Sequence, residues 1–210
     1  MKHFLHMFLC LLCTHTAHAQ QIDFNQPNDN PSQYLEEGYE AWGIPTQQQP
    51  ATKTFGGVTF TVEIEGDVKG KTLYTVRWKD GRQHSKLICD GVMVKGLDEQ
   101  GNRPELTTGR VGIKVHIPGL PNGNHTLLAY PNTTAGGDFV APPISIDVDG
   151  VTKVTGIQQT RRATSLSESA KSSVEFTVTD QRPVTITYYT VPVEGTTYTT
   201  TSLELNSLEV

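Results

Sequence analysis

Residues 111–132, VGIKVHIPGLPNGNHTLLAYPN, decide the fold class. Apolar residues at positions 111, 113, 115 and 117 alternate with Lys114 and His116, and this period of two predicts a β-strand with one buried face. The following GLPNGN predicts a turn, because proline fixes φ while glycine and asparagine tolerate positive φ. The run 126–130 is apolar enough to form a second strand. We therefore predict a β-hairpin over this stretch.

The same alternation recurs along the chain, at residues 22–24, 58–65, 72–78, 87–94, 144–154, 174–178, 184–188 and 203–210. Asp149-Gly150 is a hairpin-turn pair, and a slip in the pattern at Asn206-Ser207 predicts a β-bulge. Residues 155–173 are polar and predict a long loop. About ten strands without a long amphipathic helix favour an all-β fold, an antiparallel β-sandwich of the jelly-roll kind.

The N-terminus predicts a secretory signal peptide. Met1-Lys2-His3 is a basic start, an apolar run of ten residues follows at 4–13, and Ala17-His18-Ala19 has the A-x-A cleavage form. Ten apolar residues are too few to span a bilayer. We therefore expect residues 1–19 to be a signal peptide, residues 20–210 to be a single β-sandwich domain, and the protein to be secreted to the periplasm or cell surface.

Composition excludes several classes of protein. The mature chain keeps one cysteine, Cys89, so it is not a disulfide-stapled scaffold. The whole chain has a formal charge of −5 and no basic run, which argues against nucleic-acid binding. No segment after the leader is apolar enough to be a membrane span.

No catalytic or metal-ligating residue is assigned from motifs. The chain has no Gly-x-Ser-x-Gly elbow, and Cys89 precedes Asp90, whose charge disfavours a thiolate. Residues 66–72 are one residue short of a phosphate loop and lead into a strand, not a helix. Asp147-x-Asp149-Gly150 lacks the further ligands of a calcium loop and fits a β-turn better. Paired carboxylates for glycoside cleavage need only converge in space, and nothing in the sequence selects a pair.

Three segments resemble a known family: SKLICDGV at 85–92, GLPxGxHTLLAY at 119–130 and LxLNxLEV at 203–210. They are similar to the malectin-like, galactose-binding-like accessory domains of secreted polysaccharide-degrading proteins of gut Bacteroidetes, pectate lyase-type proteins especially. The resemblance covers most of residues 22–210, and its motifs are mainly structural. It implies a β-sandwich in a carbohydrate context. In the family a catalytic β-helix or similar module usually follows, whereas this sequence stops at the last strand.

Sugar binding requires an aromatic face for the C–H face of a pyranose and polar groups for its hydroxyls. An acidic pectic sugar would also pair with arginine. The candidate ligand-binding residues are Trp42, Trp78, Arg77, Arg82 and Asn132. Each has a competing explanation, because the tryptophans suit the core and the arginines suit solvated loops. Jelly-roll carbohydrate modules often hold a structural calcium ion, and the sequence names no ligands for one; no other cofactor is expected.

We therefore expect a non-catalytic carbohydrate-binding or accessory domain of a secreted polysaccharide utilisation protein, acting on pectin. Its partners would be a plant cell-wall polysaccharide or oligosaccharide and a catalytic module. One alternative is a structural domain that packs against a downstream polysaccharide lyase module without binding sugar. Another is a lyase or hydrolase in its own right.

Overall fold

The computed structural model describes residues 19–46, 49–66, 68, 72–78, 85–96, 109–134, 140–191, 198 and 200–210. The expected signal peptide, apart from Ala19, and the candidate ligand-binding residue Arg82 lie outside the described residues.

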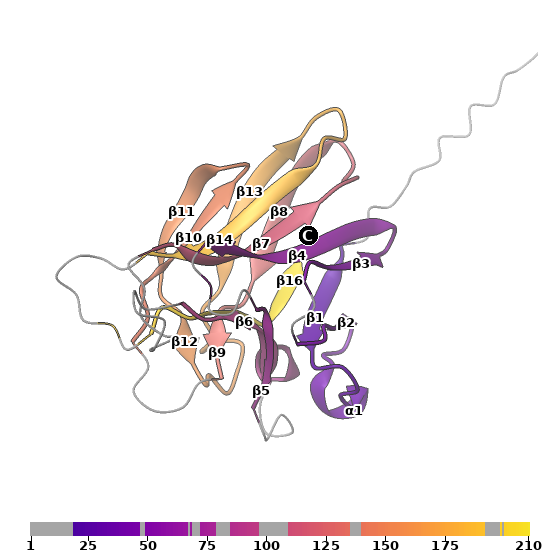
Figure 1. The fold of residues 1–210 in the computed structure, drawn as a ribbon. Helices are drawn as coiled ribbons and strands as arrows, with labels where there is room; N and C mark the ends of the chain where they lie inside the picture. Colours follow the sequence, from indigo (N-terminus) through magenta and orange to yellow (C-terminus); the bar gives the residue numbers. More distant parts are fainter. Residues whose placement is uncertain are drawn as a thin grey trace, which may run out of the picture.

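The architecture is an all-β sandwich of two large sheets (Figure 1). The six-stranded sheet has the order β11 (Val151–Ile157), β10 (Ile144–Val148), β14 (Val184–Thr190), β7 (Val111–Ile117), β4 (Val58–Gly66), β3 (Ala51–Phe55). The five-stranded sheet has the order β13 (Ser172–Val178), β8 (Gly123–Ala129), β16 (Ser207–Glu209), β1 (Gln21–Asn25), β2 (Glu40–Gly43). All pairs in these sheets are antiparallel except β1–β2. The predicted fold class is confirmed.

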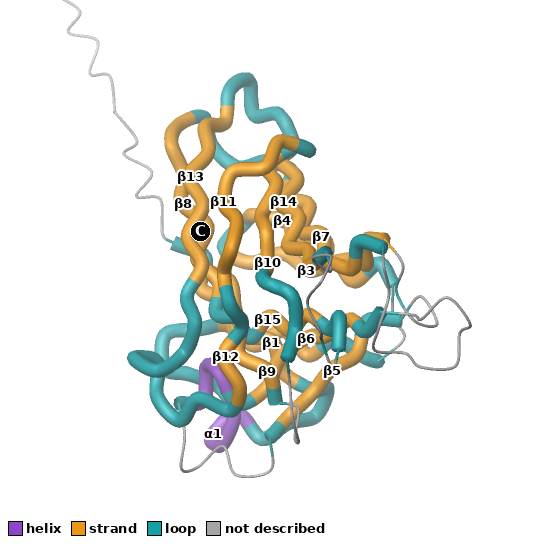
Figure 2. The backbone as a smooth tube through the Cα atoms, turned by 90° about the vertical axis from the view of Figure 1, so that its left-hand side faces the viewer, coloured by secondary structure: helices purple, strands orange, loops and turns teal. Residues whose placement is uncertain are grey.

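Smaller elements gather at one end of the sandwich. A three-stranded sheet there has the order β15 (Leu203–Leu205), β6 (Asp90–Val94), β5 (Tyr74–Arg77). The short strands β9 (Asn132–Thr133) and β12 (Thr160–Arg161) pair in parallel. The helix α1 (Pro31–Tyr34) lies at the same end in two perpendicular views (Figures 1 and 2). A 3-10 helix, Lys86–Ile88, leads into β6.

One apolar core lies between the sheets and takes side chains from Ile22 through Leu208. Alternation explains it, since every second residue of β4, β7 and β14 points inward. An aromatic cluster fills one part, where the Trp42 ring lies 5.6 Å from the Phe24 ring and 5.3 Å from the Phe55 ring between centroids. Burying each such side chain contributes roughly 1.5–3 kcal/mol.

The predicted hairpin over residues 111–132 is wrong, although both of its strands exist. β7 pairs with β14 and β4 in one sheet, whereas β8 pairs with β13 and β16 in the other. The turn residues therefore carry the chain across the core, and Leu120 is buried at the crossing. Alternation marks a strand and its buried face, but both sheets bury one face against the same core and so give the same pattern.

Other local predictions have mixed outcomes. The hairpin at Asp149-Gly150 is confirmed: β10 and β11 pair around it, with φ of 49° and 80° at the two turn residues. The predicted bulge at Asn206 is wrong, because the chain changes sheet there, from β15 to β16. The predicted loop 155–173 contains the end of β11 and all of β12. The predicted strand at 87–94 begins at Asp90, after the 3-10 helix.

Candidate functional site

A half-buried tryptophan and an exposed arginine meet beside β5, β9 and β12. The guanidinium carbon of Arg162 lies 5.1 Å from the centroid of the Trp78 ring. Arg162 is held by two hydrogen bonds, from its backbone N–H to the Thr133 carbonyl oxygen at 2.9 Å and from its Nε to the Thr134 carbonyl oxygen at 3.1 Å. The four remaining guanidinium N–H groups have no partner among the residues that the structure describes. The pair therefore presents an aromatic ring beside a fixed, open guanidinium.

Asn132 lies beneath this pair and positions it. Its side chain is fully buried, and its Oδ1 accepts from the backbone N–H of Ala163 at 3.0 Å and from Oγ1 of Thr160 at 3.0 Å. Its Nδ2 donates to the carbonyl oxygen of Ile88 at 2.9 Å. These bonds fix the segment that carries Arg162, so the structure places Asn132 in the scaffold of the site and not on its surface.

Arg77 is next to Trp78 in sequence but interacts with a different part of the molecule. Its guanidinium forms an ion pair with Asp29 and lies 4.8 Å from the centroid of the Tyr34 ring. A cavity of ≈ 130 Å³ opens there, lined by Asn25, Asp29 and Tyr34 among others. Ligand sites usually measure about 300–1,000 Å³, so this cavity is not our candidate for a sugar.

Trp42 lies in the core, where only 3% of it is exposed and its ring packs against Phe24. The structure therefore brings together Trp78 and Asn132 among the sequence-predicted residues, and keeps Trp42 and Arg77 apart from them. Arg162 was missed, because a second arginine in a polar stretch gives no local signal of an aromatic partner far along the chain.

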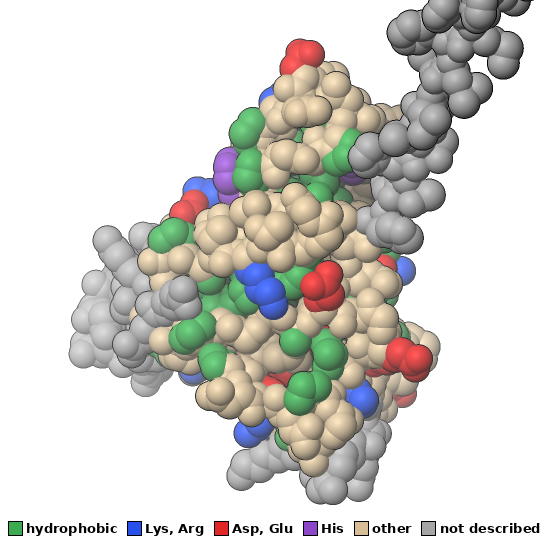
Figure 3. Space-filling view, turned by 90° about the vertical axis from the view of Figure 1, so that its right-hand side faces the viewer, with side chains coloured by type: hydrophobic (Ala, Val, Ile, Leu, Met, Phe, Trp, Pro, Cys, Tyr) green, Lys and Arg blue, Asp and Glu red, His purple; other side chains and the backbone are tan. Residues whose placement is uncertain are grey.

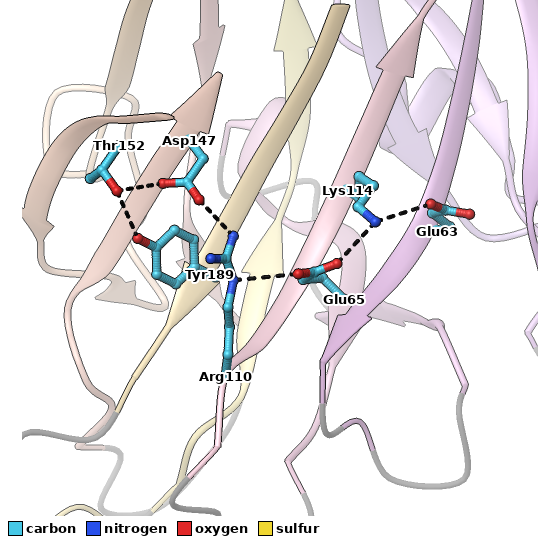
Figure 4. Close-up of polar contacts among 7 residues, drawn as sticks. All are labelled: Glu63, Glu65, Arg110, Lys114, Asp147, Thr152 and Tyr189. Atoms are coloured by element: carbon cyan, nitrogen blue, oxygen red, sulfur yellow. Dashed lines mark hydrogen bonds and ion pairs between the residues drawn. The ribbon is translucent and has the colours of Figure 1, made fainter. Parts of the chain in front are cut away.

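The outer face of the six-stranded sheet carries a network of ion pairs that sequence reasoning also missed (Figure 4). Lys114 Nζ lies 3.0 Å from Glu65 and 3.5 Å from Glu63. Arg110 bonds Asp147 at 2.9 Å, and its guanidinium carbon lies 3.5 Å from the centroid of the Tyr189 ring. Each charge in this network has an opposite charge within 3.5 Å, so the network is better explained as a stabilising cross-strand ladder than as a binding site.

The two described histidines, His116 and His125, lie on different sheets. Nδ1 of His116 lies 3.0 Å from Oγ1 of Thr185 on the six-stranded sheet. His125 belongs to β8 in the other sheet, where its ring stacks on Phe176 at 5.6 Å between centroids. Cys89 is buried, and burial raises the pKa of its thiol far above the ordinary value. Neither histidine thus forms a nucleophile–base pair with Cys89 in the described structure.

A buried polar cluster lies where β1, β6 and β16 meet. It consists of Asp23, Asn25, Asp90 and Ser207, of which Asn25 is the most exposed at 4%. Burial raises the pKa of Asp23 to about 7 and raises that of Asp90 well above its ordinary value. No group of three or more His, Cys, Asp or Glu side chains placed for a metal occurs in the described ranges. The cluster nevertheless offers carboxylate, amide and hydroxyl oxygens, the donors that Ca²⁺ prefers.

Basic and acidic side chains are scattered on the face beside β2 and β3 (Figure 3). In the part of the chain that is described, no helix is long and apolar enough to cross a membrane.

No protein-family model and no curated protein sequence matches the chain. Among solved structures, a family 35 carbohydrate-binding module from Clostridium thermocellum aligns at 10% identity and TM-score 0.34, over 77% of this chain and 97% of that one. An exo-β-1,3-galactanase from Phanerochaete chrysosporium aligns at 14% identity and TM-score 0.34, over 72% of this chain and 32% of that one. An α-xylosidase from Xanthomonas citri aligns at 13% identity and TM-score 0.29, over 78% and 17% respectively. Alignments this loose transfer no ligand, and the fold assignment rests on the strands themselves.

Proposed function

We propose that the chain is a non-catalytic carbohydrate-binding domain whose ligand is an acidic plant cell-wall polysaccharide of the pectin type. One observation carries the proposal: the Arg162 guanidinium lies beside Trp78 and is held there through its Nε by the Thr134 carbonyl oxygen, yet its four other N–H groups have no described partner. An ordered, open guanidinium next to an aromatic ring suits a sugar that carries a carboxylate.

Each group has a distinct task in this proposal. The indole of Trp78 supplies apolar area for the C–H face of a pyranose. Arg162 donates two parallel hydrogen bonds to the uronate carboxylate, a geometry that lysine does not reproduce. Asn132 takes no part in contact and acts by holding the segment 160–163 in place.

The biological setting is proposed from the sequence. The leader at residues 1–19 supports secretion to the periplasm or cell surface. The resemblance to accessory domains of pectin-degrading proteins supports a catalytic module as partner. Neither feature bears on how the Trp78–Arg162 surface binds.

Isothermal titration calorimetry of the purified chain tests the proposal, with polygalacturonate, rhamnogalacturonan, neutral galactan and xylan as ligands. We expect saturable binding of polygalacturonate and weaker binding of the neutral glycans. Arg162→Ala should reduce the affinity roughly 10- to 100-fold, the value of a hydrogen bond to a charged group. Arg162→Lys should recover little of it, and Trp78→Ala should cost at least about 10-fold.

Arg182→Ala is the matched control, because Arg182 is likewise an exposed arginine but lies in the 178–184 connection, where it forms an ion pair with Asp149 at 2.6 Å. It should bind as the wild type does. Absence of binding to every glycan would overturn the proposal and favour a domain that only packs against another module. Equal affinity of wild type and Arg162→Ala would overturn the assigned surface.

A further inference from the structure

A buried carboxyl group is bonded to the same residue that holds Arg162. Glu204 belongs to β15 and is 1% exposed. Its Oε2 accepts hydrogen bonds from the backbone N–H of Thr134 at 2.9 Å and from Oγ1 of Thr134 at 3.4 Å. The carbonyl oxygen of Thr134 in turn accepts from Nε of Arg162 at 3.1 Å. One threonine therefore joins the buried carboxyl to the exposed guanidinium.

Arg162 depends on this support because its backbone is strained. Its φ of 46° lies in the left-handed region, which is unfavourable for a residue with a Cβ atom and persists only where the surroundings hold it. The backbone N–H of Arg162 donates to the carbonyl oxygen of Thr133, and its Nε donates to that of Thr134. The same two threonines are hydrogen-bonded to the Glu204 carboxyl. A change at Glu204 is therefore transmitted to the residues that set the position of Arg162.

The charged groups around Glu204 leave Arg162 as the cation linked to it. β15 packs against β6, β9 and β7. On β6, the negative charge of Glu204 acts on a second acid, Asp90, and helps to raise its pKa. β9 has no titratable side chain, and Lys114 and His116 of β7 lie on the outer face of the six-stranded sheet, where they have other partners. Among the described residues, the basic group that hydrogen bonds connect to this carboxyl is Arg162, through Thr134.

We propose that Glu204 is a positioning residue whose protonation state controls how the Trp78–Arg162 surface binds an anionic sugar. While the Glu204 carboxyl is neutral, the guanidinium of Arg162 is free to pair with the carboxylate of a ligand. Once the carboxyl is ionised, its charge attracts the guanidinium across Thr134 and repels the carboxylate of the ligand, so the affinity falls. The inference rests on the proposed function for its ligand and adds a regulation by pH to that surface.

The direction of the pH dependence follows from the burial of the carboxyl. Burial raises the pKa of Glu204 from 4.5 to about 8, although the bonds from Thr134 and Thr133 oppose the shift. Arg162 and the uronate both stay charged from about pH 6 to about pH 9.5. Affinity should therefore be highest below the folded pKa and should fall as the pH rises through it. A like charge this close to the ligand weakens binding roughly 10-fold at an effective dielectric constant of about 20.

The first test needs no glycan. Nuclear magnetic resonance of the isotope-labelled full chain follows the carboxyl carbon of Glu204 and the backbone amides of Thr134 and Arg162 from about pH 6 to about pH 9.5. We expect the three signals to shift with one midpoint, and Glu204→Gln to remove the shifts of both amides. An Arg162 amide that stays still while Glu204 titrates would overturn the coupling. A Glu204 carboxyl that does not titrate in this range would overturn the switch.

Asp23→Asn is the matched control. Burial raises the pKa of Asp23 to about 7, so it titrates in the same range, but its Oδ2 accepts from the backbone N–H of Glu36 and not from Thr134. The shifts of the Thr134 and Arg162 amides should persist in this variant. If they disappear, Asp23 causes them and the role given to Glu204 is overturned.

The second test measures the affinity for polygalacturonate by calorimetry over the same pH range, with circular dichroism at each pH to confirm that the chain is folded. The wild type should bind about 10-fold more weakly at the alkaline end than at the acidic end. Glu204→Gln should keep at the alkaline end the affinity that it has at the acidic end. Equal pH dependence of the two proteins would overturn control of binding by Glu204. Absence of binding at every pH would overturn the proposed function instead, and the resonance titration would still decide whether Glu204 acts on Arg162.

Discussion

The backbone N–H of Asn132 donates to Oδ1 of Asn206 at 2.8 Å, across 74 positions of sequence. The other end of the same side chain, Nδ2 of Asn206, donates to the carbonyl oxygen of Asp90 at 2.5 Å. Asn206 also lies where the chain passes from β15 to β16. One buried amide therefore joins the scaffold of the Trp78–Arg162 surface, the start of β6 and the point where the chain changes sheet.

Asn206→Ala should therefore be strongly destabilising. The substitution removes the partner of the Asn132 N–H and of the Asp90 carbonyl oxygen, and Asn206 is 0% exposed, so water does not replace it. We expect a loss of about 2–4 kcal/mol in the free energy of unfolding. Urea unfolding followed by circular dichroism measures it. Asn124→Ala is the control, because Asn124 is exposed and bonds only the hydroxyl of Thr177 among described partners; a similar loss in both variants would contradict the role given to Asn206.

Sequence reasoning found strands and faces but not partners. The alternation in residues 111–117 correctly predicts β7 and its buried face. The partners of β7 are β14 and β4, which are both far from it in sequence. The next strand in sequence, β8, belongs to the opposite sheet. Which strand lies beside which depends on how the whole set covers one core, and no local pattern records that choice.

The two tryptophans should behave differently when removed. Trp42→Ala should lower the free energy of unfolding by about 3–5 kcal/mol, because it leaves a cavity between Phe24 and Phe55. Trp78→Ala should cost clearly less, because the ring is half-buried at the surface. Chemical denaturation of both variants measures the difference. A larger loss for Trp78→Ala than for Trp42→Ala would place Trp78 in the core instead.

Asn132→Ala should lower the affinity for polygalacturonate without removing any group that contacts it. Loss of the bonds to Ala163 and Thr160 frees the segment that holds Arg162. A double-mutant cycle measured by calorimetry isolates this effect. If Asn132 acts only by positioning Arg162, the double variant should bind no more weakly than Arg162→Ala alone. Full additivity of the two losses would contradict positioning.

The candidate site was only partly predictable, because its contacts join segments that are far apart in sequence. Trp78 stands out as an aromatic residue at the end of a strand, and the structure puts it at the surface. Asn132 was selected as a ligand contact, yet its buried side chain bonds the backbone of Ile88 and Ala163, two segments far from it in sequence. Asp23 and Asp90 look like ordinary polar positions in sequence, and their burial depends on distant segments, as when the backbone N–H of Glu36 donates to Oδ2 of Asp23.

Glu204 should make the protein less stable as the pH rises. Its side chain is buried on β15, where its Oε2 accepts from the backbone N–H of Thr134 at 2.9 Å, and no described cation pairs with it. Burial raises the pKa of Glu204 from 4.5 to about 8, although the bonds from Thr134 and Thr133 oppose the shift. Below pH 4.5 the carboxyl is protonated in both the folded and unfolded chains, so it carries no penalty.

Between pH 4.5 and about 8 the unfolded chain releases this proton while the folded chain keeps it. The unfolded state then binds fewer protons, so the free energy of unfolding falls with rising pH, and the contribution is constant above the folded pKa. The full effect is on the order of a few kcal/mol. Glu204→Gln should make the free energy of unfolding depend less on pH, so the variant should become more stable relative to the wild type as the pH rises. Urea unfolding curves recorded at several pH values measure this. Glu175→Gln, at an exposed position of β13, should show the same pH dependence of stability as the wild type. If Glu204→Gln also shows the wild-type pH dependence, another buried acid governs it.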